Sequence, residues 1–366
     1  MTPSDYMRLA LALARRGEGR TAPNPPVGAL LVRDGKIVGE GYHPAAGQPH
    51  AEIYALRQAG KLAHGADLYV TLEPCSHHGR TGPCAEAVIA AGVQRVFIGC
   101  GDPNPLVNGR GVALLQKAGI TVETSLLEPE CRRLLAPFVR HLQKKLPFVI
   151  LKAATTLDGA TATCSGESQW ISGEASRHHV HELRDRVDAI MVGSGTMLRD
   201  NPRLTSRIEG GRDPLRVVID SSLKTPLDAA MISQSSDAVT VIATAVSPDH
   251  PKVAPLRQQG VEILFSPAAD GSVDLLRVMQ ELGKKNVMTL LLEGGATLNA
   301  AMLRAGLVQR AMIFVAPLLL GGAGKGIFAG EGVSRLAQAL RLRDLRFQPF
   351  EGDLLIEGEV EGCLPV

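Results

Sequence analysis

The sequence has almost no excess charge of either sign. Its 39 basic and 37 acidic side chains leave a formal net charge of +2, and aromatic residues make up only 4% of the chain. Proteins that follow a nucleic-acid backbone usually carry a basic surface interleaved with aromatic side chains. We therefore expect no nucleic-acid partner.

Long hydrophobic runs and a secretion signal are also missing. The longest apolar run, around residues 311–320, is interrupted by Pro317 and is shorter than the ~20 residues that a membrane helix needs. The first 15 residues place Asp5 ahead of a short apolar stretch, which predicts an amphipathic helix rather than a signal peptide. Six cysteines in 366 residues argue for reduced thiols rather than a disulfide framework. These absences indicate a cytoplasmic protein with no membrane partner.

The length of the chain predicts two domains. Asp34-Gly35 separates two short apolar runs and predicts a tight antiparallel hairpin. Residues 128–145 form a charged helical segment that contains Pro137, and a new strand begins after Leu146-Pro147, so we place the domain boundary between residues 145 and 146. Strands are expected in the first domain at residues 29–32, 37–42, 67–72 and 95–99.

The second half repeats the alternation of apolar runs with helix-length segments, which favours a second α/β domain. It contains no G-x-G-x-x-G motif, so the usual Rossmann argument for a dinucleotide site does not apply. Strands are expected at residues 148–153, 189–192, 216–220, 239–243, 289–292 and 312–315.

The residue types of a zinc enzyme occur at short spacing in the first half. His50-Ala51-Glu52 begins an expected helix, and Cys75, at the end of TLEPC, is followed by Cys84. One imidazole and two thiolates would give zinc three protein ligands and leave the fourth position to water, as in catalytic sites. Such water attacks an amino-substituted ring carbon near neutral pH. The Glu52 carboxylate can carry the proton from water to the departing amino group.

The pattern H-x-E followed by P-C-x-x-C is typical of zinc-dependent nucleobase deaminases. Here eight residues, SHHGRTGP, separate the two cysteines instead of two, and His77 and His78 inside this insert are alternative ligands. Inert buried cysteines or a structural zinc site are the plainer interpretations. Glu52 and the lack of a clear fourth ligand argue against a structural site.

Three segments that contain these residues resemble one known family. PNPPVGALLV, GEGYHPAAGQPHAE and VTLEPCSHHGRTGPC are similar to the deaminase domain of the bifunctional riboflavin-biosynthesis deaminase-reductases, in which the long cysteine spacing is usual. The resemblance implies a cytidine-deaminase-like αβα sandwich over residues 1–145, a zinc-dependent pyrimidine deaminase. It implies zinc ligands at His50, Cys75 and Cys84, Glu52 as the proton shuttle, and Asn24, His43 and Arg80 near the substrate.

Simple chemistry supports part of this assignment. Asn24 lies in a loop bracketed by prolines, where an amide could pair with a pyrimidine edge, although a turn residue is the plainer interpretation. Arg80 could bind a ribose phosphate, and a solvated loop arginine is the alternative.

The second half carries polar and glycine-rich segments that suit a phosphorylated ligand. Gly193 and Gly195 permit close backbone approach, with Thr196, Arg199, Asp200, Arg203 and Arg207 nearby. Glu293-Gly294-Gly295 lies between an expected strand and helix, where free N–H groups can hold a phosphate. A simple turn and a solvated basic face are the alternatives.

The same resemblance extends over these segments and nearly the whole chain. It implies that residues 146–366 are a dihydrofolate-reductase-like, NADPH-dependent reductase domain, which converts the ribosyl group of the deaminated product to a ribityl chain. Ala160 is a departure, because related sequences commonly have a basic residue there; Lys152 could compensate. The implied NADPH contacts are Ala154, Trp170, Thr196, Asp200, Ser222, Gly294 and Gly295. The implied substrate contacts are Lys152, Ser168, Arg184, Leu204, Arg207 and Glu293, of which Arg184 could instead lie on a helix surface.

The leading hypothesis is thus a bifunctional enzyme that deaminates and then reduces a phosphoribosylaminopyrimidine with Zn²⁺ and NADPH. Two alternatives remain open: a deaminase that edits tRNA or single-stranded nucleic acid, which the near-neutral charge disfavours, and a non-catalytic zinc-stabilised binding module. A homodimer or higher assembly through a sheet edge or a helix face is also expected.

Overall fold

A computed structural model describes residues 1–76, 82–103, 108–322 and 324–362. The chain divides into two units, Met1–Gln143 and Lys144–Val366, each with its own hydrophobic core. The boundary expected after residue 145 lies two residues beyond this division. No helix among the described residues combines the length and the apolar character of a membrane span.

The first unit is built on a five-stranded sheet in the order β2-β1-β3-β4-β5. β1 pairs antiparallel with β2 and β3, whereas β3, β4 and β5 run parallel. Asp34 and Gly35 both have positive φ, 50° and 72°, as a two-residue hairpin of this twist requires. The expected hairpin is confirmed. The strands are β1 (Gly28–Arg33), β2 (Lys36–Tyr42), β3 (Asp67–Leu72), β4 (Arg95–Cys100) and β5 (Thr121–Glu123).

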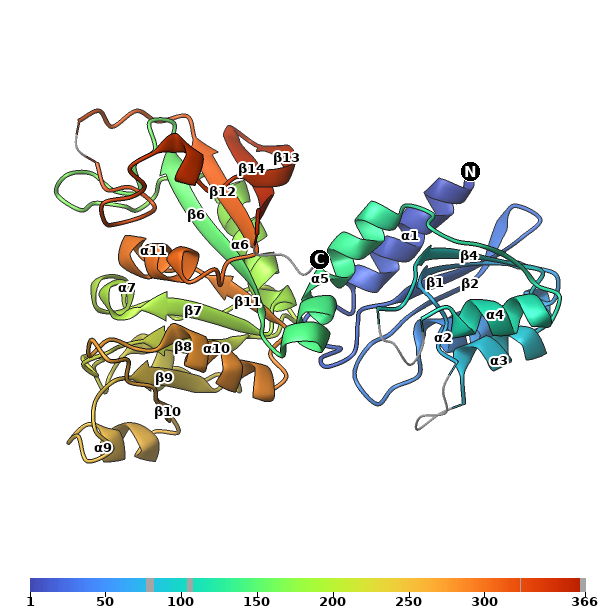
Figure 1. The fold of residues 1–366 in the computed structure, drawn as a ribbon, viewed down its shortest axis with the longest axis horizontal. Coiled ribbons are helices and arrows are strands. Elements are labelled where there is room, and N and C mark those ends of the chain that lie inside the picture. Colours follow the sequence, from blue (N-terminus) through green and yellow to red (C-terminus); the bar gives the residue numbers. More distant parts are fainter. Residues whose placement is uncertain (77–81, 104–107, 323, 363–366) are drawn as a thin grey trace. The chain divides into compact units, whose positions relative to one another are not determined.

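Helices cover both faces of this sheet, with α1 and α5 on one side and α2, α3 and α4 on the other (Figure 1). Thr2 caps α1, and the helix buries one apolar face, as the pattern of the first 15 residues predicts. Pro137 lies inside α5. The helices are α1 (Pro3–Arg15), α2 (Ala51–Ala59), η1 (Gly60–Ala63), α3 (Cys84–Ala90), α4 (Arg110–Lys117) and α5 (Glu128–Lys144).

The second unit contains a nine-stranded sheet in the order β10-β9-β8-β7-β11-β6-β12-β14-β13. The strands from β10 to β12 are parallel, and β14 and β13 add an antiparallel edge. The strands are β6 (Phe148–Thr156), β7 (Ala189–Gly193), β8 (Leu215–Ile219), β9 (Thr240–Thr244), β10 (Glu262–Phe265), β11 (Thr289–Leu292), β12 (Arg310–Ala316), β13 (Leu342–Phe350) and β14 (Asp353–Val360).

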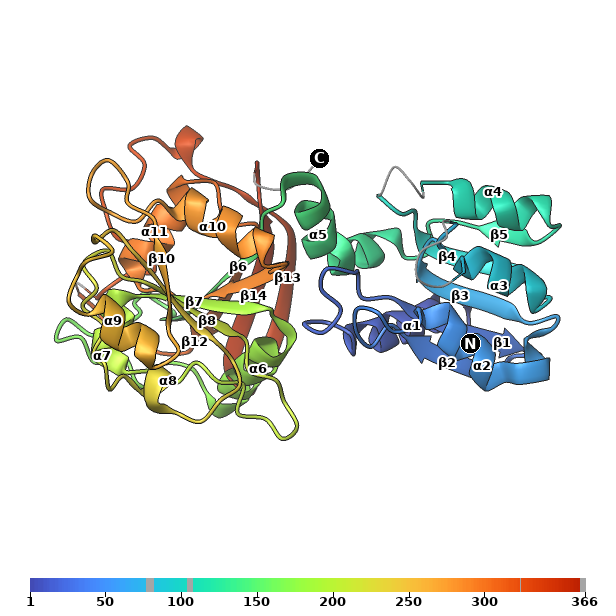
Figure 2. The ribbon, with the colours of Figure 1, turned by 90° about the horizontal axis from the view of Figure 1, so that it is seen from below.

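The parallel strands are apolar on both faces because helices cover both (Figure 2). On β7, Ala189 and Met191 belong to the core under α10 and α11, whereas Ile190 and Val192 belong to the core under α7, α8 and α9. The helices are α6 (Glu174–Arg186), α7 (Ser194–Asp200), α8 (Ala230–Ser233), α9 (Val253–Gln258), α10 (Leu275–Lys284), α11 (Ala296–Arg304) and η2 (Leu336–Gln338).

All expected strands are present, with ends shifted by up to three residues, and four strands were not predicted. β5 and β10 are short, with three and four residues. β13 is largely exposed and contains four polar or charged residues and a proline, and its opening residues Leu-Arg-Asp-Leu interrupt the apolar alternation of a half-buried strand.

Candidate active sites

The ends of one strand and two helices bring together the expected zinc ligands of the first unit. His50 is the N-cap residue of α2, Cys75 follows β3, and Cys84 is the first residue of α3. The loop after a strand and the first turn of a helix expose polar groups at the edge of an α/β sheet, where sites are usually found. The backbone N–H of Cys84 donates to the Cys75 sulfur over 3.3 Å and so joins the two elements.

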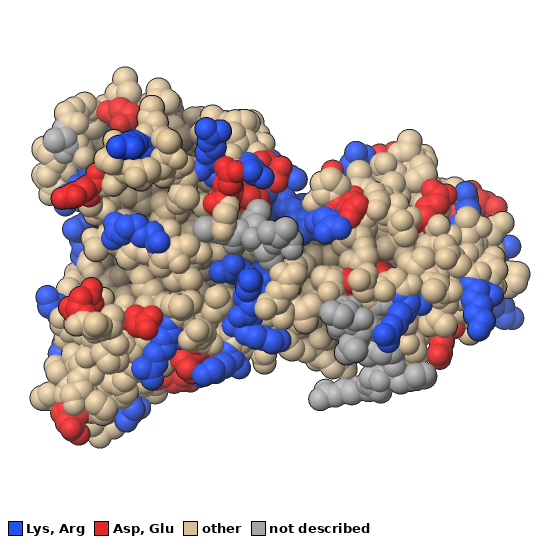
Figure 3. Space-filling model, in the orientation of Figure 1, with Lys and Arg blue, Asp and Glu red and all other residues tan. Residues whose placement is uncertain are grey.

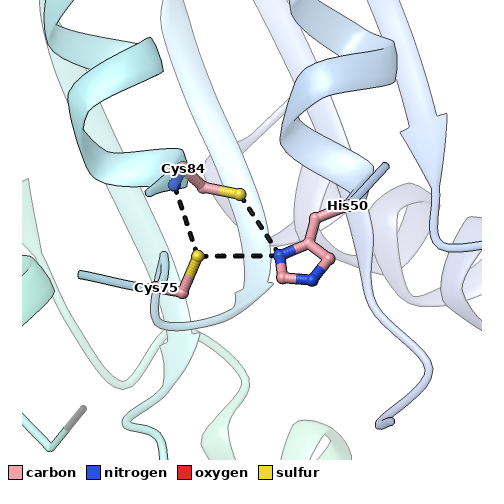
Figure 4. Close-up of side chains that lie close together, drawn as sticks. All are labelled: His50, Cys75 and Cys84. Atoms are coloured by element: carbon pink, nitrogen blue, oxygen red, sulfur yellow. Dashed lines mark hydrogen bonds between the residues drawn. The ribbon is translucent and has the colours of Figure 1, made fainter. Parts of the chain in front are cut away.

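The three side chains point toward a common centre (Figure 4). The Nδ1 atom of His50 lies 3.6 Å from the Cys75 sulfur and 3.3 Å from the Cys84 sulfur. All three candidate ligand atoms lie within 4.8 Å of one another. A tetrahedral zinc ion with normal bond lengths would hold a nitrogen and a sulfur ligand roughly 3.5 Å apart. The geometry therefore fits zinc with three protein ligands. His77 and His78, the alternative ligands, lie outside the described residues.

The two cysteine side chains lie close enough to shift each other's pKa in opposite directions. A hydrogen bond from Cys84 is the largest influence on Cys75 and lowers its pKa to about 4. The same bond, together with burial, raises the pKa of Cys84. The pair thus favours a single negative charge, and a bound divalent cation would favour the thiolate form of both sulfurs.

Glu52 is buried beside this centre, on the first turn of α2. Its Oε2 atom has no hydrogen-bond partner among the described residues. Burial raises the pKa of Glu52 to about 7, and the charge of Cys75 contributes to this increase. A buried carboxyl group with a free oxygen next to a metal site has the properties of a proton shuttle.

Asn24 and His43 are hydrogen-bonded to each other next to the metal centre. The Nδ2 atom of Asn24 lies 3.1 Å from Nε2 of His43, and Nδ1 of His43 lies 3.0 Å from the carbonyl oxygen of Pro49. Because a carbonyl only accepts, Nδ1 of His43 carries the proton and Nε2 accepts from the Asn24 amide. The ring of His43 also meets the ring of His50 edge-on, at 5.3 Å between centroids. Arg80 lies outside the described residues.

The second unit contains a cavity of about 900 Å³ beside the middle of β6 and above the ends of β7 and β11. Backbone from the starts of α7 and α11 lines one part of it, and the segments around Thr161 and Lys325 line another. Eight of the residues expected to bind cofactor or substrate line this cavity: Lys152, Ala154, Ser168, Thr196, Asp200, Glu293, Gly294 and Gly295.

The other expected contacts do not line the cavity. Trp170 is 66% exposed, and the Arg177 guanidinium lies 4.9 Å from its ring centre. Ser222 is exposed, and its neighbour Ser221 lines the cavity instead. The sequence pattern after β8 gave no means of choosing between the two serines. Arg184, Leu204 and Arg207 are also absent from the lining.

Arg184 and Glu293 bind each other through two hydrogen bonds of 2.8 Å and 3.0 Å. The Arg184 side chain is 12% exposed, so a position on the helix surface, considered from its charged context, is wrong. Burial would raise the pKa of Glu293, but Arg184 and then the Lys152 charge outweigh it and hold that pKa at about 2. Burial in turn lowers the pKa of Lys152. The carboxylate and the two cations form one charged network at the cavity.

The cavity has features that fit a dinucleotide. A methyl group at Gly294 would lie 2.8 Å from the Asn299 amide oxygen, so glycine is needed here for the chain to pack against α11. Asn299 is 2% exposed, and its Oδ1 atom has no hydrogen-bond partner among the described residues. A buried acceptor without a partner, beside the start of α11, fits a ligand that brings a donor. Asn299 was not singled out from the sequence.

The neighbourhood of Ala160 explains its small side chain. A methyl group at Gly324 would lie 2.6 Å from the Ala160 Cβ atom, so these two segments pack closely. The next residue, Lys325, is exposed and lines the cavity. The backbone of Lys325 pairs with Ala162, so a cation is present on the segment next to Ala160, although at a distant sequence position.

Comparison with protein families assigns a type to each half. Residues 1–100 match the cytidine and deoxycytidylate deaminase zinc-binding region. Residues 147–356 match the RibD C-terminal domain. The chain is 46% identical over 358 residues to the riboflavin biosynthesis protein RibD of Actinobacillus pleuropneumoniae, which covers 98% of this chain and 95% of that protein.

Solved structures agree with this assignment. RibD of Acinetobacter baumannii superposes with a TM-score of 0.82 at 38% identity, and a deaminase/reductase of Thermotoga maritima with 0.84 at 34% identity, each covering 98% of both chains. The expected fold class and the two cofactors, Zn²⁺ and NADPH, are confirmed. The protein is a bifunctional deaminase and reductase of riboflavin biosynthesis. It belongs to the RibD family.

Proposed function

We propose that residues 1–145 remove an amino group from 2,5-diamino-6-(5-phosphoribosylamino)pyrimidin-4(3H)-one, and that residues 146–366 then reduce the ribosyl group of the product to ribityl. The Thermotoga maritima relative is named for these two activities, a diaminohydroxyphosphoribosylaminopyrimidine deaminase and a 5-amino-6-(5-phosphoribosylamino)uracil reductase. The observation that carries the proposal is the convergence of His50, Cys75 and Cys84 beside the buried carboxyl of Glu52.

In the deaminase site we assign His50, Cys75 and Cys84 as the metal ligands. These residues would hold Zn²⁺, and the chemistry that the metal would supply is a water molecule activated as a nucleophile near neutral pH. Glu52 takes a proton from that water on its free Oε2 atom as the oxygen attacks the ring carbon. It then delivers the proton to the amino nitrogen, so that the C–N bond breaks and ammonia leaves.

Asn24 and His43 are placed to orient the pyrimidine. His43 accepts from the Nδ2 group of Asn24, which leaves the Asn24 oxygen to accept an N–H group of the ring. Arg80 is assigned to the ribose phosphate, on the resemblance alone.

In the reductase domain NADPH supplies the hydride. The chain has to hold the nicotinamide and the sugar carbon in contact and keep water away. Lys152 and Glu293 line the cavity and carry opposite charges, so they suit hydroxyl and phosphate groups of the substrate. Ser168, Arg184, Leu204 and Arg207 are the further substrate contacts that we propose. Ala154, Trp170, Thr196, Asp200, Ser222, Gly294 and Gly295 are the proposed cofactor contacts.

A paired assay tests the assignment. The purified protein should contain one zinc per chain, release ammonia from the diamino ribotide and then oxidise NADPH. Glu52→Gln should keep the zinc and the oxidation of NADPH with deaminated substrate, but should release ammonia about 100-fold to 10,000-fold more slowly. Normal ammonia release by this variant would contradict the role of Glu52.

We also infer that the protein self-associates through β13. This strand is the outer edge of the nine-stranded sheet, and the large apolar side chain of Phe347 is 62% exposed on it. An edge strand with exposed apolar residues is suited to a second copy of the chain. Light scattering should give a dimer or larger species, and Phe347→Lys should shift it toward the monomer.

A cytoplasmic location without a nucleic-acid partner is our further proposal. The five cysteines among the described residues are all free thiols, which suits a reducing compartment. On the face drawn in Figure 3, acidic side chains accompany the basic ones on each unit. Cell fractionation and a salt-dependent RNA-binding assay test the two statements.

A further inference from the structure

One buried carboxylate lies next to the metal centre without belonging to it. Glu73 is the second residue before Cys75 and is 4% exposed. Its Oε1 atom accepts from the backbone N–H groups of Gly111, at 2.9 Å, and Val112, at 3.3 Å. Its Oε2 atom accepts from Gly109, at 3.0 Å, and Asp102, at 3.3 Å. All four lone-pair positions of this carboxylate are thus used by backbone donors of one segment.

Three of these donors belong to the start of α4. Gly109 is the N-cap residue of that helix, and Gly111 and Val112 are in its first turn. The first N–H groups of a helix have no partner within the helix, and a carboxylate there is stabilised by both hydrogen bonds and the helix dipole. Glu73 therefore caps α4 from a distant part of the chain.

The residue between Glu73 and Cys75 also packs closely against α4. A methyl group at Gly111 would lie 2.1 Å from the carbonyl oxygen of Pro74. Pro74 joins Glu73 to Cys75, and the backbone N–H of Glu73 donates to the carbonyl of Cys100 at the end of β4. The residue before Cys75 is therefore clamped between α4 and the sheet.

Cys75 is also hydrogen-bonded to the start of α3, the helix that carries the ligand Cys84. Its carbonyl accepts from the N–H of Ala85 over 3.1 Å, and its sulfur accepts from the N–H of Cys84. A shift of the Glu73-Pro74 segment would move both sulfurs relative to His50. The hydrogen bonds of Glu73 therefore help to fix the positions of the two sulfur ligands relative to His50.

We propose that Glu73 is a positioning residue of the deaminase site: by anchoring the Cys75 loop to the start of α4, it holds the two sulfurs in place and slows the release of the metal. This inference rests on the proposed zinc ligands His50, Cys75 and Cys84. Neighbours that orient metal ligands typically change metal affinity by about 10-fold to 100-fold when they are replaced.

The direct test is Glu73→Gln, which keeps the size of the side chain. A carboxamide offers an N–H₂ group to backbone donors in place of one oxygen, so half of the acceptor positions are lost. We expect the zinc-loaded variant to transfer its metal to an excess of a chromogenic chelator roughly 10-fold or more faster than the wild type. Release at the wild-type rate would overturn the proposal.

A matched control separates positioning from general destabilisation. Thr2→Ala removes the N-cap of α1, in the same domain, where the Thr2 hydroxyl accepts from Asp5. It should lower the unfolding temperature and leave the rate of zinc release unchanged. If Thr2→Ala accelerates release as much as Glu73→Gln, the positioning role is refuted.

A measurement on the wild type covers the case in which Glu73→Gln does not fold. Coupling between two sites is reciprocal, so the metal should also hold α4 in place. On stripping the zinc, hydrogen exchange in the peptide over residues 108–117 should rise about 10-fold, with no change over α1. Equal exchange with and without zinc would contradict the proposal. If the wild type bound no zinc at all, the proposed ligands themselves would be wrong, whereas a zinc-loaded wild type with normal release from Glu73→Gln would refute only the role of Glu73.

Discussion

The two active sites of this protein differ in how the chain assembles them. The three candidate metal ligands and Glu52 lie between residues 50 and 84, on a helix cap, a strand end and a helix start. The reductase cavity takes its lining from residues as far apart as Lys152 and Ala329. One of its lining residues, Glu293, forms an ion pair with Arg184, 109 positions away along the chain.

This difference predicts different sensitivities. A compact site made from neighbouring segments depends on a few atoms with strict ligand geometry, so that a single replacement removes its chemistry. A cavity lined by several strands, helices and loops distributes binding over many residues, and its most sensitive element is the buried ion pair that joins distant segments. Amino-acid replacements in the two domains test whether the two sites differ in this way.

The largest expected effect is that of Cys84→Ala. Loss of one thiolate leaves only two protein ligands, so zinc content should fall to near zero and ammonia release by at least about 1000-fold. Reduction of the deaminated substrate should stay within about 2-fold. Cys164→Ala replaces an exposed cysteine of the other domain and should change neither activity. A full complement of zinc in Cys84→Ala would contradict the assignment of Cys84 as a required ligand.

Next in size is the buried ion pair of the reductase domain. Arg184→Met leaves the Glu293 carboxylate buried without its partner and should lower the free energy of unfolding of this domain by about 3–5 kcal/mol. Urea unfolding followed through Trp170, the only tryptophan, reports on this domain. Arg186→Met removes a more exposed pair with Glu182 in the same helix and should cost less than about 1 kcal/mol. Similar decreases in the free energy of unfolding of both variants would show that the Arg184–Glu293 pair stabilises the domain no more than the exposed pair does.

The same pair predicts the response of the reductase domain to acid. The pKa of Glu293 is held at about 2, below its ordinary value of 4.5. A lowered pKa contributes stability that is complete above pH 4.5 and is lost as the pH falls toward 2, by roughly 3 kcal/mol in total. Urea unfolding between pH 6 and 2.5 should show this slope in the wild type and a smaller slope in Glu293→Gln. Identical slopes would count against the shifted pKa.

The smallest expected effect concerns Lys325. This exposed cation lines the cavity beside Ala160 and should attract an anionic cofactor, with screening by salt. Lys325→Met should raise the KM for NADPH roughly 3-fold to 10-fold at low ionic strength, and less at high ionic strength. Lys284→Met removes an exposed lysine that pairs with Glu281 and should have no such effect. Deamination kinetics should be unchanged in both variants.

The two sites also differ in how much of each could be predicted from the sequence. The elements that carry His50, Cys75 and Cys84 were predictable because their spacing is short and the residue types of a zinc site are few. The longer parallel strands were predictable because they are buried on both faces and appear as apolar runs, whereas the short and partly exposed β5 and β10 were not. β13 could not be predicted, because an exposed edge strand has no apolar alternation.

The partners of long-range contacts were beyond reach of the sequence. Nothing in the segments around Arg184 and Glu293 indicates that the two side chains bind each other, since their proximity depends on the order of β7, β11 and β6 in the sheet. The same holds for Glu73, whose donors lie 29 to 39 residues further along the chain. Its motif was visible in the sequence, but its anchoring contacts with α4 were not.

The unsatisfied oxygen of Asn299 has a consequence for inhibitor chemistry. Any compound that fills the reductase cavity without an N–H or O–H group at this point leaves a desolvated acceptor behind, a penalty of about 1–3 kcal/mol. A screening hit that carries an amide N–H in this position avoids the penalty. Libraries for this pocket are therefore best enriched in donors rather than in purely aromatic scaffolds.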